Sequence, residues 1–185
     1  MTSLDDVLAA AGCGKSQLYY YFDSKADLVA AVIERQLELV LAKQPRLQHI
    51  ESWDAIEGWA SEILAGHSAP GGPFACPLGT MAAELKNDET FRPLLDAAFH
   101  TWEAALARGL RIMQDRGQLA VEADPERLAT AVIAALQGGM LLARVRGDIT
   151  PLRDALENAL AQLQQWKRGA HSRRRTPTAT DATPA

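Results

Sequence analysis

The sequence predicts an all-α protein, and three observations support that fold class. Apolar residues recur every three or four positions through most of the chain, and no stretch shows the strict alternation of a half-buried strand. Ser, Asp or Pro precedes several of these apolar runs, and Gly or a polar turn follows them, as at helix starts and ends. A hydrophobic content of 48% with 23% charged residues, in 185 residues, indicates a globular protein of one or two domains.

The first predicted helix begins after Ser3, which can cap it together with Asp6 three residues later. Its apolar face is formed by Leu4, Val7, Leu8 and Ala11. Gly12 follows directly and accepts the left-handed backbone conformation that ends a helix. The segment is therefore expected to be a short helix with a sharp stop.

A second helix of about two turns opens after Gly14, with Leu18 and Phe22 on its buried side. The next helix is capped by Ser24, and Lys25 in its first turn is unfavourable there unless an anion binds. Two short helices joined by a few residues containing Gly match a helix-turn-helix, whose second helix enters the DNA major groove. An ordinary helical corner with a polar outer face stays the alternative.

The stretch GKSQLYYYFDSKADL resembles the TetR-family signature, in which Leu-Tyr-x-x-Phe is followed by Ser-Lys and an acidic residue with Leu. The resemblance covers Thr2 to about Val40, and Tyr21 stands where the family often has His. The family has a helix before Thr2, so the resemblance implies a head whose first helix is missing. We expect such a head to be loosened and to bind operator DNA poorly. The predicted DNA-contacting residues are Ser3, Lys15, Ser16, Gln17, Tyr19, Tyr20, Tyr21 and Lys25.

Charge and cysteine usage restrict the possible functions. The net charge is −4 and the first 46 residues are not basic either, so charge alone argues against a DNA-binding protein. Cys13 and Cys76 have no metal-ligand spacing and favour free thiols in a reducing cytoplasm. No uninterrupted apolar run approaches the ~20 residues of a membrane span, so no membrane partner is expected. Glu84, His100 and Glu103 form no nucleophile–base set, and neither an enzyme nor a cofactor or metal site is predicted.

Six longer helical segments follow the second helix. They are expected at 23–43, 52–66, 77–86, 89–116, 124–146 and 150–166. A Gly/Pro-rich loop separates the second and third of them at 67–73. From Lys167 the composition becomes rich in Pro, Thr and Ala, which predicts a disordered tail over 168–185. The predicted domains are therefore the head at 1–43 and a ligand-binding and dimerisation domain at 46–167.

Three stretches of the second half resemble the ligand-binding domain of LmrA/YxaF-like TetR regulators: FACPLGTMAAEL, Phe91 to Trp102, and ALQGGMLLARVRGDITPL. This resemblance implies a helical sensor that dimerises through its last two long helices. The surplus apolar surface of those helices favours an interface as well. Gln137-Gly138-Gly139 either permits close helix approach or leaves room for a ligand. The predicted dimer contacts are Leu128, Val132, Gly139, Leu152, Leu156 and Leu163.

Seven large, polarisable or aromatic side chains could line an apolar effector cavity, although each could equally fill the core. They are Trp59, Phe74, Met81, Phe99, Trp102, Met113 and Met140. The sequence thus predicts a cytoplasmic homodimeric regulator that represses from a palindromic double-stranded DNA operator and is released by a small apolar or aromatic effector. The alternative is a helical ligand-binding or interaction protein that has lost DNA binding.

Overall fold

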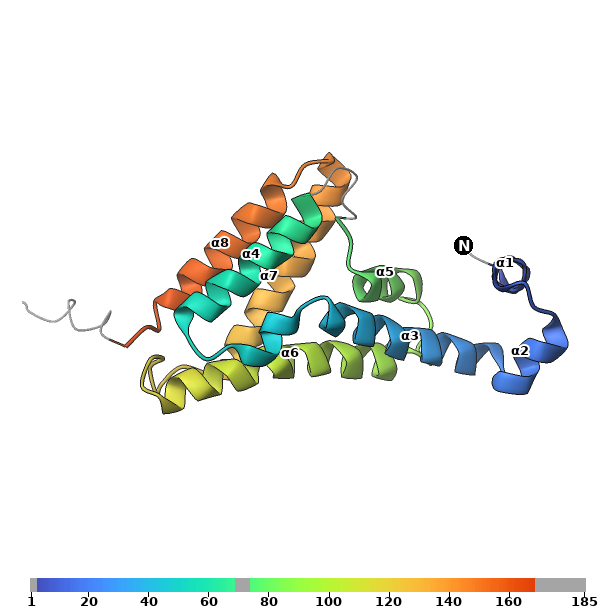
Figure 1. Ribbon diagram of the computed structural model, residues 1–185, viewed down its shortest axis with the longest axis horizontal. Coiled ribbons are helices and arrows are strands. Elements are labelled where there is room, and N and C mark those ends of the chain that lie inside the picture. Colours follow the sequence, from blue (N-terminus) through green and yellow to red (C-terminus); the bar gives the residue numbers. More distant parts are fainter. Residues whose placement is uncertain (1–2, 69–73, 169–185) are drawn as a thin grey trace, which may run out of the picture. The chain divides into compact units, whose positions relative to one another are not determined.

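The computed structural model describes residues 3–68 and 74–168, and Figure 1 shows that regular structure in these ranges is helical. The elements are α1 (Leu4–Ala11), α2 (Lys15–Tyr21), α3 (Lys25–Ala42), the 3-10 helix η1 (Pro45–His49), α4 (Trp53–Ser68), α5 (Pro77–Glu84), α6 (Arg92–Asp115), α7 (Pro125–Arg146) and α8 (Thr150–Gln164). Within the described ranges an isolated bridge between Leu119 and Lys167 is the one β-type pairing. The all-α prediction is confirmed. The expected disordered tail lies almost wholly outside the described residues.

The predicted helix caps are present in the structure. The Ser3 hydroxyl accepts the backbone N–H of Asp6 at 3.1 Å, and the Asp6 carboxylate accepts the backbone N–H of Ser3 at 2.9 Å. Gly12 ends α1 with a φ of 63°. At the start of α7, the Asp124 carboxylate accepts the backbone N–H of Arg127 at 3.1 Å. These local signals placed both helix starts correctly because a cap needs only neighbouring residues.

The prediction that a helix begins at Glu89 is wrong by three residues, since α6 begins at Arg92. The Asp88 carboxylate accepts the backbone N–H of Thr90 at 3.0 Å and holds the preceding residues in a turn. Pro93 therefore stands second in the helix, where its missing N–H costs nothing.

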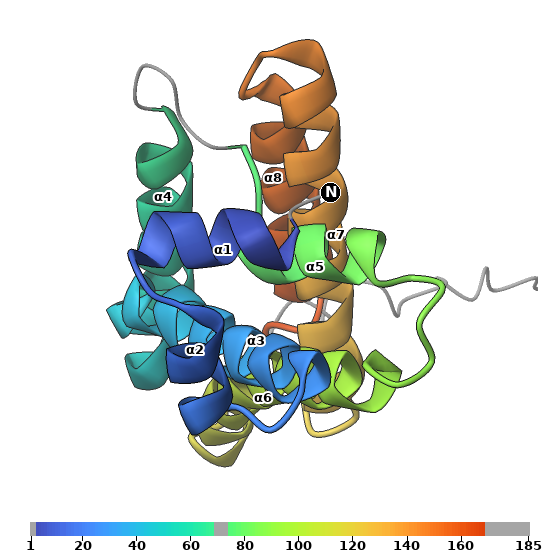
Figure 2. The same cartoon turned by 90° about the vertical axis from the view of Figure 1, so that its right-hand side faces the viewer.

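The described chain forms two compact units. The first comprises residues 1–43 and 75–102, and the second comprises residues 44–74 and 103–185. Residues 75–102 thus belong to the same compact unit as residues 1–43. The predicted bounds of the DNA-binding head and of the ligand-binding domain stay a prediction. Within the first unit, α5 packs against α3 (Figure 2). Helix α6 contributes residues to both units.

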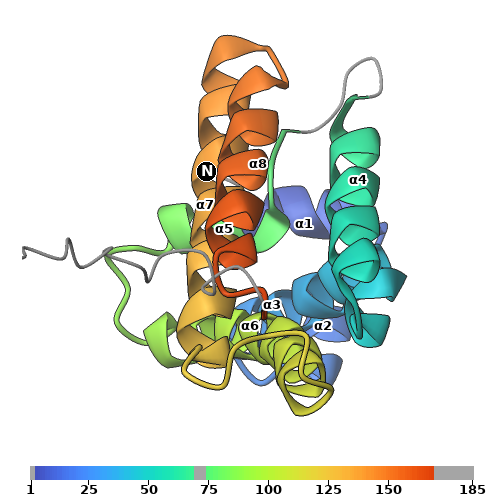
Figure 3. The same ribbon diagram turned by 90° about the vertical axis from the view of Figure 1, so that its left-hand side faces the viewer.

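In the second unit, α7 and α8 form an antiparallel pair joined by a short turn, and they lie side by side in Figures 1 and 3. Helix α4 also contacts α8. By length and composition α7 could cross a membrane, contrary to the expectation from uninterrupted apolar runs. One side of α7 lies in the core of the unit, where Ala129, Leu136 and Ala143 are fully buried, and 39% of its apolar window is buried in all.

An unpredicted contact lies between η1 and the second half of α6. Pro45 begins η1, a short helix that the sequence pattern did not predict, and Leu47 is buried. Ile50, directly after η1, lies so close to α6 that a β-carbon added to Gly109 would stand 2.7 Å from the Ile50 carbonyl oxygen. The Arg116 guanidinium pairs with the Glu51 carboxylate at 2.7 Å nearby. The chain segment leaving α3 is thereby held against α6 within the second unit.

Candidate nucleic-acid interface

Helix α2 is attached by one apolar residue and presents the rest of its surface to solvent. The backbone N–H groups of Gln17 and Leu18 both donate to the Gly14 carbonyl at 3.1 Å and close the first turn. Leu18 is buried and Phe22, at the helix end, is half-buried. The predicted buried side of α2 is thus confirmed, and Figure 2 shows the helix following α1 in the head.

Three consecutive tyrosines are exposed on α2. The exposed fractions are 49% for Tyr19, 81% for Tyr20 and 70% for Tyr21. The Tyr20 and Tyr21 rings contact each other edge to face, with centroids 5.1 Å apart. Tyrosine normally buries its ring when it has a purely structural role, because the ring contributes a large apolar area. Three exposed rings on a seven-residue helix therefore indicate a surface that binds another molecule.

The start of α2 carries exposed polar groups. The Lys15 ammonium lies 3.5 Å from the Asp5 carboxylate of α1, and both side chains are mostly exposed. An exposed pair of this length contributes little stability, so Lys15 can exchange Asp5 for a phosphate oxygen at small cost. Ser16 and Gln17 are exposed beside it.

The start of α3 differs from the sequence-based expectation of an open anion site. The Ser24 hydroxyl accepts the backbone N–H of Asp27 at 3.2 Å and donates to the Asp27 carboxylate at 2.8 Å. The first turn thus already contains an acid and a cap, and the spacing of Ser24 and Asp27 is the signal that could have shown this. Lys25 is an exposed cation at this turn.

Ser3 is engaged in the cap of α1. Its hydroxyl donates to the Asp6 carboxylate at 2.6 Å in addition to accepting the Asp6 backbone N–H. The hydroxyl and the backbone N–H of Ser3 together lower the pKa of Asp6. A DNA contact by Ser3 stays a prediction, and the structure shows the residue as a helix cap.

The seven candidate effector contacts are distributed over both units. Met81, Phe99 and Trp102 belong to the first unit, whereas Trp59, Phe74, Met113 and Met140 belong to the second. Phe99 and Trp102 stack with ring centroids 6.4 Å apart, and the Trp59 indole donates to the Gln44 side chain at 3.0 Å. Trp59, Trp102, Met113 and Met140 are buried, as core residues are. An effector-binding role for any of the seven stays a prediction.

Four of the predicted dimer contacts are buried within a single copy of the chain, namely Val132, Leu152, Leu156 and Leu163. A dimer contact by any of the six predicted residues stays a prediction. A β-carbon on Gly139 would stand 2.9 Å from the Leu152 Cα of the same chain. Helical spacing showed that these residues lie on apolar faces of their helices, but it could not show which neighbouring element covers those faces.

The sequence-based list of dimer contacts did not include three exposed apolar residues near the end of α7. Leu141, Leu142 and Val145 are 63%, 47% and 75% exposed. Further toward the start of α7, a groove of about 380 Å³ opens between α7 and α8. Its lining includes Leu128, Ala131, Val132, Ala135, Ala155 and Ala159. Of the predicted dimer contacts, Leu128, Val132 and Leu163 line this groove, whereas none of the predicted effector contacts does.

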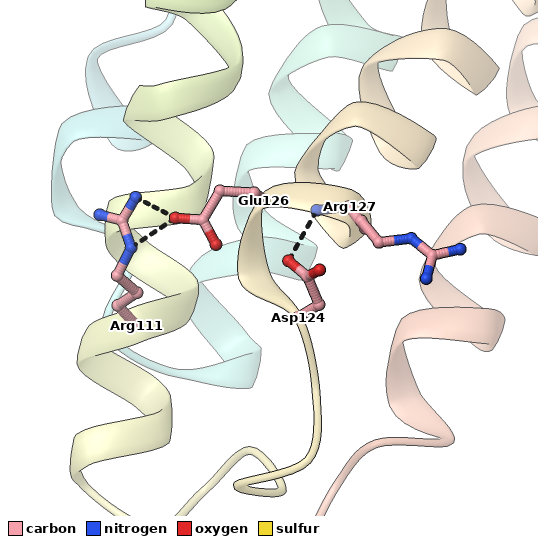
Figure 4. A network of polar contacts seen from close by, with 4 residues as sticks. All are labelled: Arg111, Asp124, Glu126 and Arg127. Carbon is pink, nitrogen blue, oxygen red and sulfur yellow. Dashed lines mark hydrogen bonds and ion pairs between the residues drawn. The ribbon is translucent and has the colours of Figure 1, made fainter.

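A polar network fixes the start of α7 in the second unit (Figure 4). The Arg111 guanidinium of α6 donates to the Glu126 carboxylate, with 2.8 Å between its Nε and the oxygen. Figure 4 shows the Arg127 side chain on the other side of α7, away from Arg111 and Glu126. Among the described residues no group of three or more His, Cys, Asp or Glu is placed to hold a metal ion.

Comparison with known families gives two matches along the chain. Residues 1–32 match the family described as bacterial regulatory proteins, tetR family. Residues 52–158 match the C-terminal domain of LmrA/YxaF-like transcriptional regulators.

Individual relatives agree with these matches. An HTH-type transcriptional regulator of the lacX 3' region of Lactococcus lactis is 32% identical over 82% of this chain and 77% of its own length. The transcriptional regulator AcuR of Cereibacter sphaeroides is 30% identical over 80% of this chain and 70% of its own. A solved structure of reduced NemR from E. coli superposes with a TM-score of 0.75 at 24% identity, covering 85% of this chain and 84% of that one. A TetR regulator from Chloroflexus aurantiacus superposes with a TM-score of 0.70 at 26% identity, covering 90% and 86%.

Proposed function

Because the chain belongs to the TetR family of transcriptional regulators, with a DNA-binding head and an LmrA/YxaF-like C-terminal domain, we propose that it is a ligand-released repressor. In this proposal a cytoplasmic homodimer occupies a palindromic operator and blocks transcription. A small apolar or aromatic effector binds the C-terminal domain and lowers the affinity for DNA.

The observation that carries this proposal is the surface of α2. Three exposed tyrosines lie next to Lys15, Ser16 and Gln17 on one short helix. Lysine and hydroxyl groups bind phosphates, a glutamine amide can form a bidentate pair with adenine, and an aromatic ring packs on thymine methyl groups. These groups together are what a helix in the major groove needs.

Two-fold symmetry supports the palindromic operator. A homodimer built on an isologous interface presents two identical recognition helices related by a two-fold axis. Such a dimer binds two inverted half-sites whose centres are separated by about one helical turn, or a multiple of it. Release by an effector requires that the effector bind one arrangement of the two heads more tightly than the other.

The second candidate is a helical ligand-binding or interaction protein that has lost DNA binding. It is favoured by the acidic residues of the head, since Asp5 and Asp6 are exposed on α1 and Asp5 pairs with Lys15. Carboxylates near a DNA-facing helix repel phosphates, and they weaken the non-specific part of the affinity most.

An in vitro selection separates the two candidates. A library of random DNA duplexes is selected with the wild-type chain, with Tyr20→Ala, and with Val121→Ala as a matched control at an exposed apolar residue of the second unit. We expect wild type and the control to enrich the same inverted repeat and Tyr20→Ala to enrich none. A folded wild-type protein that enriches no sequence would support the second candidate.

A further inference from the structure

A side-chain amide in the middle of α7 is buried without a hydrogen bond. The Gln137 side chain is half-buried, and its amide nitrogen, Nε2, is completely covered. Among the described residues no acceptor is placed to receive a hydrogen bond from this nitrogen. A covered donor has lost its hydrogen bonds to water, so it is unfavourable unless an acceptor replaces them. The Gln137 amide therefore gains free energy from any molecule that brings an acceptor to it.

Gln114 of α6 shows how the second unit satisfies an amide of the same kind. The Nε2 of this half-buried glutamine donates to the backbone carbonyl oxygens of Ala120 at 2.9 Å, Val121 at 3.2 Å and Ala123 at 3.0 Å. Gln114 thus holds the segment between α6 and α7 in place. Gln137 has the same donor, but the described part of the chain supplies no carbonyl oxygen to it. A structural role like that of Gln114 does not account for Gln137.

Gln137 points away from the contact between α7 and α8. Gly139, which lies against Leu152 of α8, is two residues further along and about 200° around the helix axis. Thr130 lies two turns before Gln137 on the same side of α7, and its hydroxyl donates to the Glu103 carboxylate of α6 at 3.1 Å. Gln137 is not among the residues that line the groove between α7 and α8. Its amide therefore belongs to a different side of α7 from that groove.

The surroundings of Gln137 favour an uncharged ligand. Its helix neighbours Ile133 and Met140, one turn before and one turn after it, are apolar and only 2% and 6% exposed. In the described part of the chain no charged side chain is buried, so a carboxylate or ammonium group entering here would meet no buried counter-charge. A carbonyl oxygen accepts a hydrogen bond without carrying a net charge, as the three acceptors of Gln114 do.

We propose that the second unit binds a small neutral molecule whose carbonyl oxygen accepts a hydrogen bond from Gln137, while its apolar part packs on Ile133 and Met140. Because the amide nitrogen is covered, the ligand reaches it only when a neighbouring side chain moves, and the flexible thioether chain of Met140 can do so at small cost. The ligand thus binds an arrangement that differs from the one described here, as release from DNA requires. This site rests on the effector binding of the proposed function, and it narrows the effector from apolar or aromatic molecules to those that carry a carbonyl group.

A pair of matched substitutions tests whether the Gln137 amide is free to serve a ligand. Methionine resembles glutamine in length and helix propensity but has no donor. Gln114→Met removes the three hydrogen bonds of that side chain and should lower the thermal midpoint, Tm. Gln137→Met removes no hydrogen bond and should leave the Tm unchanged or raise it. A lowered Tm in Gln137→Met would show that the amide has a structural partner, such as an ordered water, and would overturn the proposal.

Small molecules that share a carbon skeleton test the ligand class. One set is 1-tetralone, tetralin and tetralin-1-carboxylate, and another is acetophenone, ethylbenzene and phenylacetate. We expect the two ketones to raise the Tm of the wild type and of Gln165→Met, a control at an exposed glutamine after α8. The hydrocarbons and the carboxylates should raise it less or not at all. In Gln137→Met the dissociation constant of each ketone should rise roughly three- to tenfold, and the difference between ketone and hydrocarbon should disappear.

The outcomes separate this site from the proposed function. Equal binding of ketones and hydrocarbons, ketone binding that Gln137→Met leaves unchanged, or no binding by any of the six molecules would overturn the carbonyl site. The repressor would still stand if the wild-type chain enriches an inverted repeat in the selection from random DNA. A chain that enriches no DNA but binds the ketones through Gln137 would overturn the repressor and retain the site.

Discussion

Gly139 of α7 and Leu152 of α8 lie so close that a β-carbon on the glycine would stand 2.9 Å from the Leu152 Cα and 3.0 Å from the Ala155 Cβ. This contact brings the two helix backbones together at the centre of the second unit. The neighbouring Gly138 has open space around its Cα instead. Two identical adjacent residues therefore have different surroundings, and substitutions at the two positions should have different effects.

Gly139→Ala should destabilise the fold. The methyl group can be accommodated only if the backbone of α8 moves, and overpacking of this kind typically costs about 1–3 kcal/mol in the free energy of unfolding. Urea denaturation followed by circular dichroism measures the change. The control is Gly66→Ala in α4, where nothing lies within 4 Å of the added carbon, and which should be neutral or stabilising by up to about 1 kcal/mol. Equal effects of both substitutions would contradict the close approach.

Gly109→Ala should loosen η1 from α6. The added carbon would stand 2.7 Å from both the Cβ and the carbonyl oxygen of Ile50, and a backbone oxygen cannot rotate away as a side-chain tip can. We expect a loss of about 1–3 kcal/mol in unfolding free energy. Amide exchange should accelerate at Leu47 and Ile50 in this variant and stay unchanged with Gly66→Ala. Unchanged protection at both residues would show that the contact between Gly109 and Ile50 does not hold η1 against α6.

The capping box of α1 should make the head sensitive to acid. The pKa of Asp6 is lowered in the folded state, first by the Ser3 hydroxyl and then by the Ser3 backbone N–H. A lowered pKa stabilises the fold above the group's ordinary value of 3.8, and this contribution is lost as the pH falls through the lowered pKa. The protection factors of the α1 amides, which correct for the slower intrinsic exchange in acid, should therefore fall at low pH in wild type. Asp6→Asn should remove that pH dependence, whereas Asp5→Asn, which leaves the box intact, should retain it.

Lys25 and Gln17 should differ in how their substitution changes the salt dependence of DNA binding. Lys25→Ala should weaken binding to the selected DNA evenly across sequences and reduce the slope of affinity against salt, because a phosphate contact carries no base identity. Fluorescence anisotropy over a salt series measures this slope. An unchanged slope would show that Lys25 does not reach the DNA backbone.

Gln17→Ala should instead change sequence preference. If Gln17 pairs with a base edge, its loss should relax discrimination at one base position by ~1–3 kcal/mol and leave the salt slope unchanged. Binding to a set of operators with single base-pair changes tests this. Uniform weakening across the whole set would assign Gln17 to the backbone and not to a base.

The helices and several of their ends could be predicted from the sequence because their causes are local. The caps at Ser3 and Asp124 and the left-handed Gly12 depend only on residues within one turn. The exposed surface of α2 could also be predicted from local spacing, because Leu18 is the one buried residue of this short helix and the polar residues and tyrosines around it face solvent. The capping contact between Asp27 and Ser24 was not predicted, although the three-residue spacing of the two was visible.

The sequence by itself determined that α7 and α8 are long and apolar helices. Only the tertiary structure decided which apolar face meets α8 and which meets solvent. Leu156 is buried and Leu142 is half exposed, although both lie on apolar stripes of helical spacing. The physical reason is that the spacing of apolar residues indicates which face of a helix is apolar, whereas the burial of that face depends on which element packs against it. Gly138 and Gly139 are adjacent identical residues in the sequence, and the positions of Leu152 and Ala155 of α8 distinguish them.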